Sequence, residues 1–158
     1  MRRSIRPRLL LDWLMLRLAR GLRPYLARAP LVWGDASRLS LGRNVHLVDA
    51  VVNLRSGTVS IGDHAFLGHG VMLLTGQHDY RSRGAARQTI VADSGNDIRI
   101  GHGVWIASGV IVLGPCEIGD DAVIGAGCVV TGVVPSGVII TGGAARKTRE
   151  ITFHDDRD

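Results

Sequence analysis

The sequence predicts an all-β fold: a parallel β-helix of hexapeptide repeats that carries an N-terminal helix and one extruded loop. Between residues 98 and 141 an aliphatic residue returns at every sixth position, as Ile100, Ile106, Val112, Ile118, Ile124 and Val130. A period of six is typical of a solenoid with three short strands in each coil and aliphatic side chains in a narrow core. The 21 glycines and seven aromatic residues among 158 also favour stacked turns over a helical core.

Length and composition fit one β-helical domain with an extension at each end. A chain of 158 residues with 46% hydrophobic content is of single-domain size. We expect an N-terminal helical segment over 1–30, the β-helix over 31–147 with a loop at 77–97, and a polar C-terminal tail over 148–158. Cys116 and Cys128 are expected to be small core residues too far apart for a disulfide, which is consistent with a reducing, cytoplasmic compartment.

The segment 1–34 carries all the excess positive charge of the chain. It holds eight Arg against Asp12, a net charge of +7, whereas the rest of the chain holds 11 basic and 13 acidic side chains, a net charge of −2. A body with that balance lacks the basic stripe that a nucleic-acid backbone requires. Nucleic acid is therefore not expected as a partner.

The N-terminal segment favours a helix from about Pro7, ending near Gly21 and Pro24. Its apolar run is far shorter than a bilayer crossing requires, and its interspersed charges argue against a signal peptide. We expect the helix to pack on the β-helix or on a neighbouring subunit. The alternative is peripheral attachment to the anionic inner face of a membrane through its arginines.

The first coils are less regular than the last ones. Leu41 and Ile61 occupy comparable places, but their separation exceeds one regular coil of three hexapeptides by two positions, which predicts a two-residue bulge within 53–58. Leu73 and Ile100 are also not separated by a multiple of six positions, and the polar, Gly-containing segment 77–97 lies between them. An excursion of this length from a compact repeat is usually functional or disordered.

The last coils resemble those of the hexapeptide-repeat acyltransferases. The similar stretches are 100–107 (IGHGVWIA), 118–127 (IGDDAVIGAG) and 129–131 (VVT), and they look like those of galactoside, maltose and surface-polysaccharide O-acetyltransferases. The resemblance implies a left-handed prism and transfer of an acetyl group from acetyl-CoA, without a required metal, to a hydroxyl of a sugar or surface glycan. It also implies a homotrimer whose subunits share the ligand groove. An amino-sugar nitrogen stays open as the acceptor.

The start of the loop, Gly76 to Tyr80, is similar to the segment that leaves the prism in those enzymes and provides their general base. By this resemblance His78 is the expected base, because a neutral imidazole can accept the proton of a hydroxyl that attacks a thioester. Asp79 is a candidate to orient His78, although neighbouring side chains on an extended chain point apart. A backbone carbonyl is the other candidate for that contact.

The resemblance also implies where the donor would bind. Residues of the last coils expected to border the acetyl-CoA groove are Trp105, Ala107, Ser108, Gly125 and Ala126. The segment 142–147 departs from the Asn-Pro pattern of the family, which leaves Arg146 and Lys147 as candidates for the phosphates.

Two other functions remain open from the sequence. The first is a metal enzyme like the γ-class carbonic anhydrases, since His46, His64, His69 and His102 lie on the expected prism. Leu74 stands where those enzymes have a second ligand after His69, so we expect solvated turn histidines instead. The second is a non-catalytic β-helix scaffold.

Overall fold

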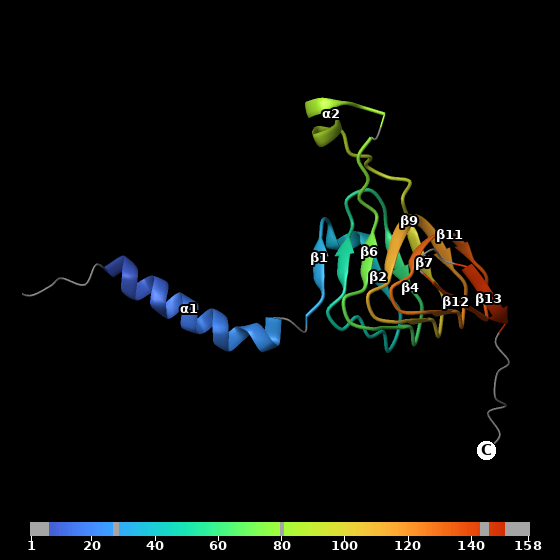
Figure 1. Cartoon of the computed structure of the whole chain (residues 1–158), viewed down its shortest axis with the longest axis horizontal. Coiled ribbons are helices and arrows are strands. Elements are labelled where there is room, and N and C mark those ends of the chain that lie inside the picture. Colours follow the sequence, from blue (N-terminus) through green and yellow to red (C-terminus); the bar gives the residue numbers. More distant parts are fainter. Residues whose placement is uncertain (1–6, 27–28, 80, 143–145, 151–158) are drawn as a thin grey trace, which may run out of the picture.

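The computed structural model describes residues 7–26, 29–79, 81–142 and 146–150. Helix α1 (Pro7–Leu26) precedes a solenoid of short parallel strands, and an arm rises from the solenoid between β6 and β7 (Figure 1). A parallel β-helix with an N-terminal helix and one extruded segment was the fold expected from the repeat, and the structure confirms it.

The solenoid has three faces. Face A stacks β1 (Leu31–Trp33), β3 (Val51–Asn53), β6 (Met72–Leu74) and the first parts of β9 (Ile111–Ile118) and β11 (Val129–Val134). Face B stacks β2 (Leu39–Leu41), β4 (Val59–Ile61), β7 (Ile98–Ile100) and the second parts of β9 and β11. Face C stacks β5 (Phe66–Leu67), β8 (Trp105–Ile106), β10 (Val123–Ile124) and β12 (Val138–Thr141). The chain runs through the faces in the order A, B, C and returns to A.

Alternate side chains of each strand point into the core, as the burial pattern of β9 shows. The hexapeptide positions fill it in stacked columns: Val52, Leu73, Val112 and Val130 on face A, and Leu67, Ile106, Ile124 and Ile140 on face C. Both cysteines are free and buried in this core, as expected. Burial raises the pKa of the Cys116 thiol to about 11, so it stays a neutral thiol.

The extra residues of the early coils lie at the corner between faces A and B, and they differ in number from the expected bulge. The strand registers place five residues at this corner in the first two coils (34–38 and 54–58) and two in the fourth (114–115). The third coil inserts the whole arm, 75–97, at the same corner. The first two coils are therefore both enlarged, by three residues each at this corner, where the sequence predicted one bulge of two.

Other boundaries also differ from those expected. The arm contains the short helix α2 (Gly84–Thr89), and the 3₁₀ helix η1 (Ala36–Arg38) occupies the first A–B corner. Strand β13 (Arg146–Glu150) pairs antiparallel with β12, so regular structure continues past the expected end of the domain at Lys147. Helix α1 stands away from the solenoid (Figure 1), and its described apolar side chains, which lie between Leu11 and Leu22, are exposed. Among the described residues the helix does not pack on its own prism, one of the two places where packing was expected; packing on a neighbouring subunit stays a prediction.

A column of glycines follows face B because no side chain fits between the coils there. The column consists of Gly42, Gly62, Gly101 and Gly119, each directly after a strand of face B. A Cβ built on Gly62 would lie 2.7 Å from the backbone carbon of Gly101 and 2.7 Å from the nitrogen of His102. Backbone atoms of the next coil cannot yield as a side chain would, so the ~4.8 Å spacing of the strands sets this preference.

The variant Gly62→Ala is expected to destabilise the fold by about 2–3 kcal/mol, since the added methyl group must push two coils apart. Urea unfolding followed by circular dichroism measures the change. Gly70→Ala is the matched control: Gly70 has open space around its Cβ position but a φ of +66°, and strain alone costs about 1 kcal/mol. Equal losses in the two variants would contradict the steric explanation.

Candidate active site

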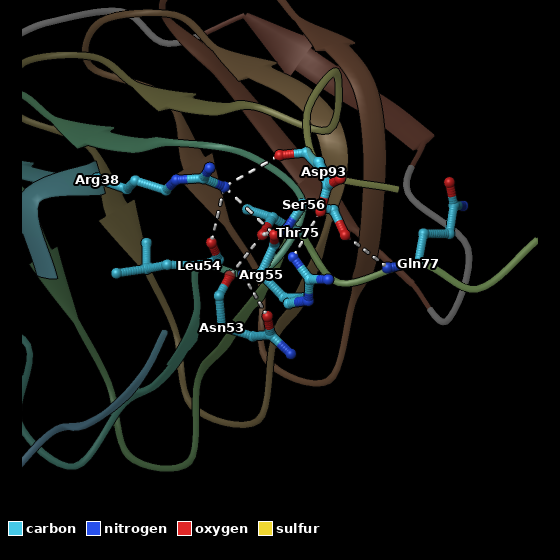
Figure 2. A network of polar contacts seen from close by, with 8 residues as sticks. All are labelled: Arg38, Asn53, Leu54, Arg55, Ser56, Thr75, Gln77 and Asp93. Atoms are coloured by element: carbon cyan, nitrogen blue, oxygen red, sulfur yellow. Dashed lines mark hydrogen bonds and ion pairs between the residues drawn. The ribbon is translucent and has the colours of Figure 1, made fainter. Parts of the chain in front are cut away.

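The root of the arm is fixed to the preceding coils by a network of polar contacts (Figure 2). The Arg38 guanidinium donates hydrogen bonds to the carbonyls of Leu54 (3.4 Å), Arg55 (3.2 Å) and Asp93 (3.1 Å). Arg55 in turn forms an ion pair of 2.8 Å with the Asp93 carboxylate. Because Asp93 lies on the returning limb of the arm, these two arginines connect the first, second and third coils at one corner.

Two buried hydroxyls hold the outgoing limb. The Ser56 amide donates to Oγ1 of Thr75 at 3.1 Å, and the Thr75 hydroxyl donates to the Asn53 carbonyl at 2.8 Å. The Gln77 amide donates to Oγ of Ser56 at 3.3 Å (Figure 2). Ser56 and Thr75 are 0% and 1% exposed. Buried hydroxyls that lose their partners are costly, so this pairing fixes the direction in which the chain leaves the prism just before His78.

The returning limb is held in the same way. Thr58 donates to Oδ1 of Asp97 from its amide at 2.7 Å and from its hydroxyl at 2.8 Å, and these bonds hold the pKa of Asp97 below its usual value. The Asn96 amide donates to the Ser56 carbonyl at 3.1 Å. Both ends of the arm therefore rest on the enlarged corner of the second coil.

His78 lies on a short antiparallel stem above this root. It forms a bridge with Val91, and the stem is closed by hydrogen bonds from Asp79 N to Ile90 O (3.1 Å) and from Ala92 N to Gln77 O (3.3 Å). The His78 side chain is exposed. No described residue forms a hydrogen bond with the imidazole, so within the described part of the chain its ring is open to a ligand or another subunit.

The Asp79 carboxylate does not make the contact with His78 that was considered from the sequence. It accepts hydrogen bonds from Oγ of Ser82 (2.8 Å) and from the Arg81 amide (3.0 Å). The Ser82 hydroxyl and then the Arg81 amide hold the pKa of Asp79 below its usual value. Among the described residues, none of its bonds reaches His78. Asp79 thus shapes the turn that follows His78 and is not the orienting acceptor of the imidazole here.

The expected donor residues gather at another corner, where face C returns to face A. Ala107 and Ser108 follow β8, while Gly125 and Ala126 follow β10 in the adjacent coil. The amide of Ala107 donates to the Ile124 carbonyl (2.8 Å), and the Gly127 amide donates to the Ser108 carbonyl (3.0 Å). Small residues thus line this edge over two coils.

Trp105 borders that edge on face C. The residue is 46% exposed, and its indole stacks on Phe66 at 5.9 Å between ring centroids, with 13° between the planes. The stacking fixes the orientation of the indole. For Arg146 and Lys147 the structure describes only the backbone, which pairs with Thr141 and Ile140; their expected role toward phosphates lies outside the described side chains.

The remaining histidines of the prism include three with polar neighbours. Nδ1 of His102 accepts from the Asp63 amide at 3.0 Å, Nδ1 of His69 lies 3.3 Å from Oδ2 of Asp49, and that of His64 lies 3.5 Å from Nδ2 of Asn44. Within 7–26, 29–79, 81–142 and 146–150, no group of three His, Cys, Asp or Glu side chains is placed to hold a metal ion.

Face A connects the two candidate edges, and its outer surface is apolar. The outward residues are Leu31, Val51, Met72, Ile111 and Val129 in one column and Trp33, Asn53, Leu74 and Leu113 in the next. Several are well exposed, Trp33 at 61% and Met72 at 38% among them. Face B carries Ser40, Ser60, Arg99, Glu117 and Val133 at comparable places. Contiguous exposed apolar side chains of this kind are candidates for an interaction face.

The sequence indicated His78 and the donor edge but not the root of the arm. Arg38, Arg55, Ser56, Thr75 and Asp93 come from three different coils, and none carries a motif. Their partnership depends on how many residues each A–B corner holds. The irregular steps from Leu41 to Ile61 and from Leu73 to Ile100 were the signals in the sequence that pointed to this corner.

Comparison with known proteins supports the repeat and the fold. The family profile "Bacterial transferase hexapeptide (six repeats)" matches residues 97–132. The chain is 34% identical over 133 residues to the galactoside O-acetyltransferase of Escherichia coli K12, covering 82% of this chain and 61% of that protein. It is 33% identical over 124 residues to the galactoside O-acetyltransferase of Lactococcus lactis, with 72% and 56% covered. The chain therefore spans less than two thirds of these relatives.

Solved structures show the same likeness. A galactoside acetyltransferase in complex with coenzyme A has a TM-score of 0.70 and 32% identity, over 79% of this chain and 61% of that one. A maltose O-acetyltransferase from Clostridium difficile 630 has a TM-score of 0.63 and 27% identity, over 80% and 68% of the two chains. The solenoid is thus the left-handed hexapeptide β-helix of these acyltransferases.

Proposed function

The described β-helix carries the hexapeptide repeat of bacterial transferases and resembles the galactoside and maltose O-acetyltransferases, and from this premise we propose that the chain is an acetyl-CoA-dependent O-acetyltransferase. Its acceptor is a hydroxyl of a sugar or surface glycan, and His78 is the general base. The observation that carries the proposal is the exposed His78, held on its stem at one edge of the apolar face A, opposite the small-residue edge at Ala107 and Ala126.

In this reaction His78 removes the proton of the acceptor hydroxyl as its oxygen attacks the carbonyl carbon of the thioester. The new carbon–oxygen bond forms, the carbon–sulfur bond breaks, and the thiolate of coenzyme A takes up the proton that the imidazole held. No covalent enzyme intermediate is required. The root network contributes by positioning, since a base displaced by about 1 Å loses much of its effect.

The active site is completed between subunits of a homotrimer. Within one chain His78 projects from the A–B corner, whereas Ala107, Ser108 and Ala126 lie at the C–A corner, on the far side of face A. In a head-to-tail contact around a threefold axis, face A of each copy meets the next copy. The A–B corner of one copy, which carries the arm, then lies next to the C–A corner of its neighbour, which carries the small residues. The groove so formed has a base on one wall and the donor edge, with Trp105, on the other.

Incubation with acetyl-CoA and a panel of sugars, with release of free thiol as the readout, tests the activity. We expect acceptor-dependent release that is unchanged by EDTA, because the thioester carbonyl requires no Lewis acid in this scheme. Activity that disappears with chelator and returns with zinc would instead support a metal enzyme. A trimer that neither binds coenzyme A nor releases thiol with any acceptor would support a scaffold.

The contact through face A is tested with Met72→Glu. Met72 lies at the centre of that face, and by symmetry each copy would bury one carboxylate without a partner. We expect association at least about 100-fold weaker by sedimentation velocity, with the solenoid retained. Ser60→Glu, at the comparable outward place on face B, is the matched control and should leave the trimer intact. The reverse pattern would assign the contact to face B.

A further inference from the structure

Helix α1 offers an amphipathic surface that the rest of the described chain leaves uncovered. It stands apart from the solenoid (Figure 1), and its exposed apolar side chains include Leu11 at 63%, Met15 at 61% and Leu18 at 51%. Among the side chains that the structure describes on this helix, seven large hydrophobic ones are exposed, whereas a helix at a protein surface normally buries its apolar face. Some partner must therefore cover it.

The two sides of the helix differ in chemistry. Leu11, Leu14, Met15, Leu18 and Leu22 follow the spacing i, i+3, i+4, i+7 and i+11, which places them on one side of the helix. Arg17 and Arg20 lie on the opposite side, together with Trp13 and Leu16. The Arg17 guanidinium lies 4.5 Å from the centre of the Trp13 ring, so it covers that aromatic surface with positive charge.

Charge decides which partner fits. The segment 1–34 carries +7, so pairing of α1 with α1 of another copy brings like charges together. A nucleic acid would satisfy the arginines and leave the apolar side uncovered. An anionic bilayer satisfies both sides, because its acyl boundary receives the leucines while its headgroups attract the arginines. Along the described residues no helix is long and apolar enough to cross a membrane, so the helix would lie in the surface.

We propose that α1 is a membrane-surface helix that attaches the protein to anionic lipid through Leu11, Leu14, Met15, Leu18 and Leu22, with Arg17 and Arg20 at the headgroups. The rest of the chain carries −2 and is not attracted to such a surface, so attachment depends on this helix. The body is then held at the bilayer, where an acceptor carried on a lipid would be within reach. This inference concerns attachment and does not depend on the acyltransferase activity.

Flotation of the intact protein with vesicles tests the proposal. We expect binding to vesicles of phosphatidylcholine mixed with phosphatidylglycerol, little binding to pure phosphatidylcholine, and a steep loss at high salt. Leu18→Gln should weaken binding by about tenfold or more, since it removes a side chain from the apolar side. Leu16→Gln is the matched control, a similarly exposed leucine on the arginine side, and should change binding by less than about twofold. The double variant Arg17→Gln/Arg20→Gln should lose about 20-fold on anionic vesicles.

Three flotation outcomes would overturn the proposal. They are no flotation of the intact chain, equal effects of Leu16→Gln and Leu18→Gln, and undiminished flotation of a chain shortened by residues 1–26. A Leu18→Gln variant that changes the oligomeric state in the absence of lipid would also overturn it, by assigning the apolar side to a second copy.

Discussion

His78→Ala is expected to reduce kcat by a factor of about 10² or more while affinity for coenzyme A and the fold stay nearly unchanged. A general base contributes about 10²–10⁴ to a rate, and no other histidine stands in the segment 75–97. The side chain is exposed and makes no hydrogen bond with any residue that the structure describes, so its removal should cost little stability. Steady-state kinetics with saturating acceptor, together with urea unfolding, separates the two effects.

The matched control is His64→Asn, at an exposed turn with a φ of 62°, a conformation that Asn tolerates. It should retain near-normal turnover. Retention of turnover by His78→Ala would remove His78 from the reaction. A large loss in both variants would indicate a general effect on the prism.

The regular part of the fold was predictable because the chemistry of each coil is local. An aliphatic residue at every sixth position must face the core, and the small residue after it must pass the next coil at backbone distance, as Gly62 and Gly101 do. Because these constraints repeat in every coil, the stretch from Ile100 to Val130 is enough to predict the coil length, and no contact between distant segments has to be known. The structure confirms the core columns that this period predicted.

The root of the arm was not predictable for the opposite reason. Arg38, Ser56, Thr75 and Asp93 meet because the first two coils are enlarged at the corner from which the arm of the third coil leaves. A residue count does not reveal which hydroxyl faces which amide. The contacts of Asp79 could not be predicted from the sequence either. Its adjacency to His78 suggested an orienting acceptor, but a short side chain satisfies the nearest amides of its own turn, here that of Arg81.

The surroundings of helix α1 are a third feature that the sequence could not predict. Its helical character follows from composition, but the partner of an amphipathic surface is a property of the surroundings. The sequence favoured packing, because that is the usual fate of such a helix. In the structure the described apolar side chains between Leu11 and Leu22 cover nothing on their own prism. Packing on a neighbouring subunit stays a prediction, as does contact with lipid.

Two inactive variants are expected to restore each other's activity when they share a trimer. His78→Ala removes the base, and Ala126→Trp fills the donor edge, where Ala126 lies beside Ser108 of the adjacent coil. Because the proposed site takes its base from one copy and its donor edge from the next, a mixed trimer contains an interface in which both contributions are intact. A closed ring of three copies has three interfaces. One of them is intact in a mixed trimer, whether it contains two copies of His78→Ala or two copies of Ala126→Trp.

Co-expression of the two variants with different affinity tags, followed by purification through both tags, isolates the mixed trimers for the thiol-release assay. We expect about a third of wild-type activity, against about a hundredth or less for either variant alone. The control is a chain that carries both changes, mixed with the wild-type chain. In these trimers only an interface between two wild-type copies should be active, which controls for subunit exchange. If mixed trimers stay as inactive as their parents, base and donor edge belong to the same chain, and face A serves assembly without completing the site.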